Sequence, residues 1–156
     1  MLFSLLLGAV LCGCAILEPA QVKHFKNIES YTYAYINATQ TLSSGVGGSV
    51  PIYGGGSYGY YASKSVNPTD VIAGILMKRG LIISNTLDKP QTAIVSYGQS
   101  GQRYVAGGLG GYTLEVSIQI IDAQTKEPIY ICTAEGQGST EADDIRQAVN
   151  RCLGEL

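Results

Sequence analysis

Residues 112–135, YTLEVSIQIIDAQTKEPIYICTAE, predict the β-hairpin around which the rest of the fold is arranged. From 112 to 121, apolar and polar residues alternate, which is the period of a strand with one buried and one solvated face. Residues 122–128 form a polar turn, and 129–135 return as a second strand. The apolar side of the first strand consists of Tyr112, Leu114, Val116, Ile118 and Ile120, and the polar side of Thr113, Glu115, Ser117 and Gln119.

One helix is predicted before this hairpin and one after it. Residues 68–79 follow Asn67, a good N-cap, and end before Gly80, the residue type favoured just beyond a helix. Residues 140–153 place apolar residues on one helical face, and acidic residues near their start complement the helix dipole. That apolar face consists of Ala142, Ile145, Val149, Cys152 and Leu153.

Shorter stretches complete the predicted sheet. Residues 30–38 alternate tyrosine with smaller residues, and 81–84 and 92–97 are apolar runs typical of short strands. This order of elements predicts an α+β fold, with a mixed, mostly antiparallel sheet of four to five strands and two helices packed on one face. The 156 residues are 46% hydrophobic with a net charge of −2. We therefore expect a single domain over 27–156 and no nucleic-acid partner.

Two glycine-rich segments, 43–65 and 98–111, are predicted to be loops, the first either a long loop or a loose hairpin. Their tyrosines combine a large contact area with a polar tip, which makes them candidates for binding a partner. Packing over the open face of the sheet explains them equally well. The candidates are Tyr53, Tyr58, Tyr60, Tyr61 and Tyr104.

The first residues resemble a bacterial lipoprotein signal. The apolar run 2–11 is shorter than the about 20 residues of a membrane-spanning helix and fits the core of a secretory signal. It leads into Leu11-Cys12-Gly13-Cys14, which resembles a lipobox. This implies a signal peptide over 1–13, acylation of Cys14 with a chain such as palmitate, and a lipidated tether over 14–26. Ala15 after the cysteine implies the periplasmic face of the outer membrane, by resemblance to enteric lipoproteins.

From about Phe25 onward, the chain resembles a family of bacterial envelope lipoproteins, the DUF4136-like group. The hairpin also resembles that of periplasmic lipoproteins similar to the penicillin-binding-protein activators. The resemblance implies an α+β domain in the cell envelope and no defined activity. It rests on the aromatic strand 31–35, the helix ending in Arg79-Gly80, the IVSY of 94–97, the IQIIDAQT of 118–125, Ile129-Tyr130, and Ala148-Val149.

No group of residues in the sequence predicts catalysis. His24 is the sole histidine and lies in the predicted tether, where we expect a solvated side chain rather than the oriented imidazole of a triad. The GGGSYG of 54–59 matches a dinucleotide-binding pattern, but no helix begins before Pro68. The cysteines lack the tight spacing of zinc ligands. We therefore expect no catalytic residue, no metal and no cofactor.

These observations favour a non-enzymatic, membrane-anchored periplasmic lipoprotein that acts as an interaction or structural module. Its expected partner is an envelope protein or a glycan. The alternative is a small-ligand carrier or an envelope enzyme, with a cleft formed by the tyrosine- and glycine-rich loops. That alternative requires a pocket lined by converging polar groups.

Cys132 and Cys152 are the candidate disulfide, because an oxidising periplasm favours pairing of the two thiols left in the mature chain. Cys132 belongs to the last predicted strand and Cys152 to the apolar face of the next helix. Thirteen helical residues, 140–152, advance about 18 Å, against about 10 Å for strand residues 132–135. The helix must therefore cross the strand obliquely or begin beyond the sheet. Two buried free thiols are the alternative.

Titration of thiols in the unfolded, unreduced mature protein tests this pairing. We expect no free thiol beside the lipidated Cys14, and two after reduction. Closure of a loop of about 20 residues stabilises the fold by roughly 3 kcal/mol, so the reduced protein should also unfold at lower urea. Two free thiols before reduction would reject the bridge.

Overall fold

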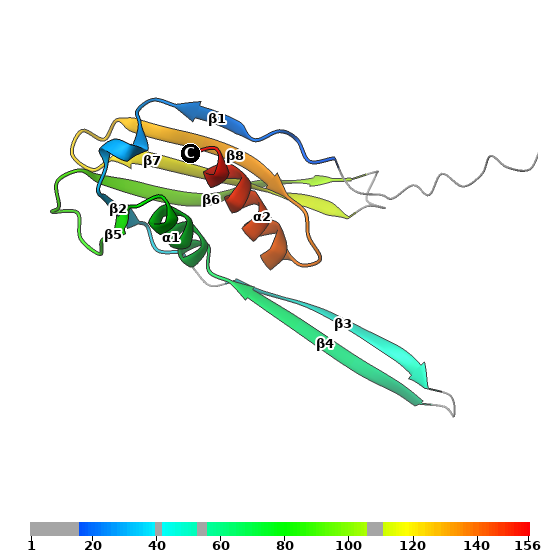
Figure 1. The fold of residues 1–156 in the computed structure, drawn as a ribbon. Coiled ribbons are helices and arrows are strands. Elements are labelled where there is room, and N and C mark those ends of the chain that lie inside the picture. The colour runs from blue at the N-terminus through cyan, green and yellow to red at the C-terminus, as the bar shows by residue number, and fades with distance from the viewer. Residues whose placement is uncertain (1–15, 40–41, 53–55, 106–110) are drawn as a thin grey trace, which may run out of the picture.

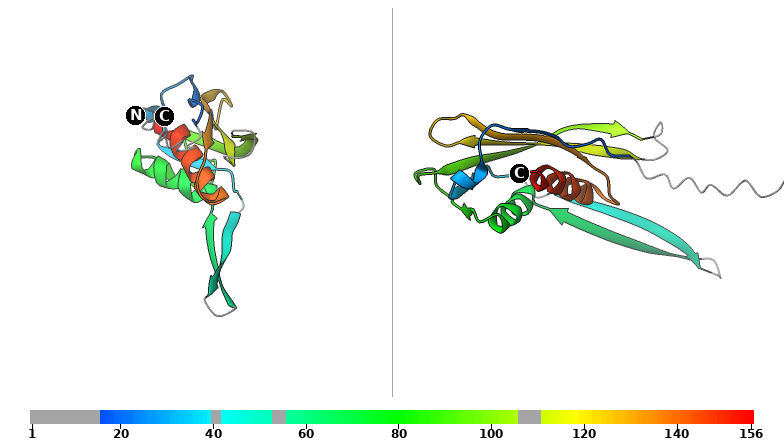
Figure 2. Two further views of the ribbon diagram at one scale, coloured as in Figure 1. Left: turned by 90° about the vertical axis from the view of Figure 1, so that its right-hand side faces the viewer. Right: turned by 45° about the horizontal axis from the view of Figure 1, so that its top comes forward.

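The computed structural model describes residues 16–39, 42–52, 56–105 and 111–156, and only the backbone of 42–52 and 56–63. Within these residues the chain forms a six-stranded sheet, two α-helices on one face of it, and a separate two-stranded hairpin that projects from the domain (Figure 1, Figure 2). The α+β class and the pair of helices agree with the sequence prediction. The strand number exceeds the predicted four to five.

The strands of the main sheet lie in the order β1-β8-β7-β6-β2-β5. β2 runs parallel to both of its neighbours, and the remaining pairs are antiparallel. A short 3-10 helix, η1, connects β1 to β2. The bounds are β1 Gln21–His24, η1 Ile28–Ser30, β2 Tyr33–Ile36, β3 Leu42–Ile52, β4 Gly56–Val66, α1 Pro68–Lys78, β5 Ile82–Ile83, β6 Thr92–Tyr104, β7 Tyr112–Asp122, β8 Pro128–Gly136 and α2 Glu141–Gly154.

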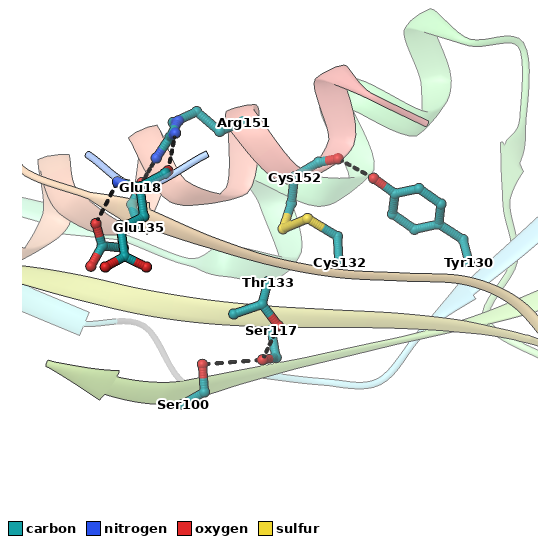
Figure 3. Close-up of a disulfide and its surroundings, with 9 residues drawn as sticks. All are labelled: Glu18, Ser100, Ser117, Tyr130, Cys132, Thr133, Glu135, Arg151 and Cys152. Atoms are coloured by element: carbon teal, nitrogen blue, oxygen red, sulfur yellow. Dashed lines mark hydrogen bonds between the residues drawn. A yellow bond between two sulfur atoms is a disulfide. The ribbon is translucent and has the colours of Figure 1, made fainter. Parts of the chain in front are cut away.

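The predicted central hairpin is β7–β8, and its two faces are as the alternation indicates. The apolar residues of β7 face the helices and are buried; they are Leu114, Val116, Ile118 and Ile120. On the opposite face, hydroxyl groups connect three strands. Ser117 lies 3.0 Å from Thr133 on β8 and 3.1 Å from Ser100 on β6 (Figure 3). This polar face needs no covering layer, which explains why both helices gather on the other side.

Both helices begin and end within one residue of the predicted bounds. The side chain of Asn67 accepts a hydrogen bond from the Thr69 amide, and Thr140 does the same for the Asp143 amide. Gly80 follows α1 with a φ of +89°, a conformation that favours glycine. Arg79 reaches α2, where its Nη2 donates to the carbonyls of Leu153 and Gly154 at 2.9 and 3.0 Å. This cation satisfies the free carbonyl end of α2.

The two cysteines are bonded as the sequence analysis expects, with Cα atoms 5.5 Å apart (Figure 3). Next to the bridge, the hydroxyl of the buried Tyr130 donates to the carbonyl of Cys152. The bridge joins α2 to β8 near the end of the helix. It lies inside the core that α2 shares with β7 and β8.

Gly136 explains how helix and strand lengths match. A Cβ here would overlap the carbonyl oxygen of Asp144 and lie 2.9 Å from the Ala148 nitrogen, so the helix backbone crosses directly over this residue. The first turn of α2 therefore lies beyond the end of β8. The part from residue 146 to Cys152 advances about 9 Å, less than the roughly 13 Å between Gly136 and Cys132, so the helix no longer overshoots the strand. The crossing is also oblique (Figure 1).

Three sequence expectations are corrected by the fold. The predicted tether 14–26 contains β1, which pairs with β8 and adds a strand to the sheet. Of the two alternatives for 43–65, the structure has the hairpin, as the regularly paired β3 and β4, whereas the predicted loop at 98–111 begins as strand, because β6 continues to Tyr104 beside β7. The first predicted strand, 30–38, is shorter and follows η1. Glycine-rich composition suggested loops because glycine weakens strands, but long strand pairing outweighs that preference here.

Substituting Gly136 with alanine should destabilise the protein strongly, because the added methyl group overlaps the α2 backbone. We expect a loss of roughly 3 kcal/mol in the free energy of unfolding, measured by urea denaturation. The matched control is Gly74→Ala in the middle of α1, where a Cβ meets nothing within 4 Å. That variant should gain up to about 1 kcal/mol from helix propensity. Equal stabilities of the two variants would contradict the close crossing.

Candidate functional site

A partly buried ion pair lies where the N-terminal segment meets the sheet. Arg103 on β6 and Glu135 on β8 form it across β7. Glu18 and Arg151 lie beside Glu135 (Figure 3). Alternation from Cys132 places Glu135 on the face away from α2. We call these residues, with Thr113, the Glu135 cluster.

The carboxylate of Glu135 is fully engaged. Arg103 donates two hydrogen bonds, from Nε to Oε1 at 2.8 Å and from Nη2 to Oε2 at 2.7 Å. Thr113 donates to Oε1 at 3.0 Å, and the backbone amide of Glu18 donates to Oε2 at 2.9 Å. Glu135 is only 6% exposed. The two parallel hydrogen bonds from Arg103 fix the orientation of the carboxylate and add charge-assisted binding energy, so this contact is rigid.

The electrostatics of the cluster favour the ionised carboxylate. The hydrogen bonds from Arg103, together with those from the Glu18 amide and Thr113, lower the pKa of Glu135 to about 2 despite its burial. The carboxylate in turn raises the pKa of Arg103. Both groups therefore stay charged at any physiological pH. This stability suits a structural clamp and does not suit a proton-transferring residue, whose pKa lies near the working pH.

The cluster holds the backbone of residues 16–18 against the domain. Arg103 Nη2 donates to the Ile16 carbonyl at 3.3 Å. Arg151, from α2, donates to the Glu18 carbonyl at 2.6 Å and to the Glu135 carbonyl at 2.6 Å. Strand β6, strand β8 and helix α2 thus all contribute to fixing this short segment. It leaves the domain at the end where β6 and β7 approach their connecting turn (Figure 1).

A second set of contacts fixes the base of the β3–β4 hairpin. Lys64 at the end of β4 forms an ion pair with Asp143 of α2 at 2.8 Å, which lowers the pKa of Asp143 to about 2. Arg146 donates to the Ser65 carbonyl at 3.1 Å, and Val66 is buried in the core. Before β3, Thr39 hydrogen-bonds to Asn67 and Thr69. The direction of the hairpin is therefore set by the domain.

The structure distributes the predicted site residues as follows. Cys14 and Tyr53 lie outside the described residues. Tyr58, Tyr60 and Tyr61 lie on β4, in the part whose backbone alone is described. Tyr104, at the end of β6, is 71% exposed.

His24 is exposed, as expected, but belongs to β1 rather than to a tether. Its ring lies 5.0 Å from that of Tyr130 in an edge-to-face arrangement. The imidazole therefore packs on an aromatic ring of the neighbouring strand β8.

A shallow hollow of about 550 Å³ lies beside β1, remote from the hairpin. It is lined by residues 24–29 together with Arg79 and Leu156, and none of the candidate tyrosines lines it. Among the described residues, no group of three or more His, Cys, Asp and Glu side chains is placed to hold a metal ion.

The described part of the chain contains no helix with the length and apolar character needed to cross a membrane.

Comparison with known proteins identifies no family for this chain. No family model matches the chain, and no curated protein matches it. Among solved structures, it is similar to a PDZ domain protein from Parabacteroides distasonis ATCC 8503, at 11% identity and a TM-score of 0.49, over 90% of this chain and 36% of that one. The chain spans about a third of that protein, and the similarity carries no functional inference. The resemblance to the DUF4136-like group stays a prediction.

Sequence reasoning missed the Glu135 cluster, because its members are far apart in the chain. One signal was available: Arg103 is the single charged residue within 98–111. A lone charge in an otherwise uncharged segment predicts a specific partner. Glu135 lies six residues before the first acidic residue of α2, but it pairs with Arg103 of β6.

Acid should weaken the fold partly through Glu135. Its pKa is about 2 in the folded protein and 4.5 in the reference state, so its contribution is complete above pH 4.5 and is lost as the pH falls towards 2. Glu135→Gln should lower the free energy of unfolding at pH 7 by about 2 kcal/mol, the size of charge-assisted hydrogen bonds.

Urea denaturation between pH 7 and pH 2 measures both effects. The gap between wild type and Glu135→Gln should narrow as the pH falls, because protonation removes the same interaction from the wild type. The exposed Glu155→Gln serves as the control. A gap that stays constant across this range would show that the charge of Glu135 contributes nothing.

Proposed function

We propose that this protein is an acyl-anchored lipoprotein of the bacterial envelope that acts as a non-enzymatic interaction or structural module. The observation that carries the proposal is the clamp on residues 16–18, directly after the lipobox-like Leu11-Cys12-Gly13-Cys14. Two arginines and a buried carboxylate hold this segment in place, which supports a role for it in positioning the anchor relative to the domain. The expected location is the periplasmic face of the outer membrane.

The clamp gives the proposed anchor a defined position. Cys14 is two residues from Ile16, so even a fully extended chain separates their Cα atoms by only about 7 Å. Acyl chains on Cys14 would therefore hold the end of the domain that carries the Glu135 cluster close to the bilayer. Lipid chains contribute about 0.8 kcal/mol per buried CH₂, so several of them on one cysteine give stable attachment.

The interaction surface of this module is the β3–β4 hairpin, together with the exposed Tyr104 at the end of β6. The hairpin and that end of β6 extend to the same side of the domain (Figure 1). Four of the five candidate tyrosines belong to this hairpin segment. The hollow beside β1 is lined by other residues, so it is not the cleft that the carrier or enzyme alternative requires.

Acylation can be tested by expressing the protein in bacteria with an alkyne analogue of palmitate. Wild type should carry the label, lose residues 1–13 and fractionate with the outer membrane. Cys14→Ser should lose the label and keep its signal peptide, because the acylated thiol is gone. Cys12→Ser is the matched control and should behave as wild type. A labelled Cys14→Ser protein would contradict the assignment of the anchor.

A further inference from the structure

The β3–β4 hairpin has a composition unlike the rest of the molecule. Its two strands have 11 residues each. Residues 42–52 and 56–63 contain no Asp, Glu, Lys, Arg or His, and the first charge on β4 is Lys64 at the base. A two-stranded hairpin without a hydrophobic layer against it is marginally stable in water. This segment therefore requires an environment that the domain does not supply.

The register divides the hairpin into two unlike faces. Cross-strand pairs such as Val50 with Tyr58 and Val46 with Ala62 place even-numbered residues of both strands on one face. Its larger residues are Val46, Val50, Ile52, Tyr58, Tyr60 and Ala62, and between them and at the base lie Ser44, Gly48, Gly56 and Lys64. The opposite face, apart from Tyr61, contains glycine, serine and proline: Ser43, Gly45, Gly47, Ser49, Pro51, Ser57, Gly59, Ser63 and Ser65. One apolar and one small, polar face is the pattern of a strand between lipid and a polar environment.

The hairpin points towards the side on which the proposed anchor lies. From its base on α2, it extends in the same general direction as the turn end of β6–β7 and the N-terminal segment, and it reaches further than either (Figure 1, Figure 2). If acyl chains hold that end of the domain at the bilayer, a hairpin that extends beyond it on the same side can reach the membrane. Strands of about 9–11 residues match the hydrocarbon thickness of a bilayer.

We propose that the β3–β4 hairpin inserts into the lipid bilayer beside the acylated Cys14, with the face that contains Val50 and Tyr60 against the lipid chains. The inference rests on the proposed function, which places the anchor. Lys64 then lies at the membrane surface, where its ion pair with Asp143 joins the hairpin to α2.

Insertion has a consequence for the backbone. Within the hairpin sheet, β3 and β4 pair only with each other, which leaves one edge of each strand without a strand partner. Unpaired amide and carbonyl groups each cost several kcal/mol in hydrocarbon. Hairpins of neighbouring copies must therefore lie edge to edge when inserted, which makes membrane insertion and self-association a single event.

Single-tryptophan variants test insertion directly, because the chain contains no tryptophan. Tyr60→Trp and Tyr58→Trp report from the same face of the hairpin, so either one suffices if the other misfolds. Phe25→Trp is the matched control, because Phe25 is an exposed aromatic residue next to Ile129 at the far end of the sheet. The acylated proteins are reconstituted into phosphatidylethanolamine–phosphatidylglycerol vesicles with and without brominated acyl chains.

In the Tyr60→Trp and Tyr58→Trp variants, we expect the tryptophan emission to shift to shorter wavelength and to lose most of its intensity with brominated lipid. The emission of the Phe25→Trp control should remain unquenched. If the protein floats with the vesicles while the hairpin tryptophans stay unquenched, the hairpin inference is overturned and the anchor stands. If the protein does not float, the proposed function fails first.

Self-association has its own readout. In the mature protein, Cys132 and Cys152 are bonded to each other and Cys14 is acylated. The Ser49→Cys variant therefore has a single free thiol, at residue 49. Oxidation in vesicles should crosslink this variant into dimers, whereas Ser139→Cys, at the exposed start of α2, should remain monomeric. Monomers from both variants would overturn edge pairing between copies.

Discussion

The close crossing of α2 over Gly136 is the constraint on which the remaining contacts depend. Because residue 136 has no side chain, the helix backbone lies directly on β8. This sets the height and angle of α2, brings Cys152 to Cys132, and lets the Tyr130 hydroxyl meet the Cys152 carbonyl. A larger residue at this position would raise the helix and separate all of these groups.

From that position, α2 contacts both the base of the β3–β4 hairpin and the N-terminal segment, the two parts on which the proposed function rests. Its first half holds the base of the hairpin, through Asp143 and Arg146. Its second half holds the N-terminal segment, through Arg151. One helix therefore determines how the hairpin is oriented relative to the point where the chain leaves the domain. Arg79, which follows α1, binds the carbonyl groups at the C-terminal end of the same helix.

Local patterns in the sequence predicted the elements whose structure depends on near neighbours. The alternation in β7, the caps at Asn67 and Thr140, and the apolar face of α2 all give short-range signals. β1 gave no such signal, because its partner strand lies more than a hundred residues away. In the Glu135 cluster, the carboxylate contacts residues that are 22 to 117 positions away, beyond the reach of any local pattern. The segment of β3 and β4 was predicted as a loop or a loose hairpin, because composition does not reveal the register of pairing.

The pairing of the first strand with the last also determines the order in which the protein folds. Glu18 and Glu135 are 117 residues apart, so their contact closes one of the longest loops in the chain, and such contacts form slowly. During synthesis the N-terminal segment emerges first, yet its binding surface on β8 and α2 emerges last. The clamp therefore closes late, once β8 and α2 have come together, and until then the N-terminal segment is not held against the domain.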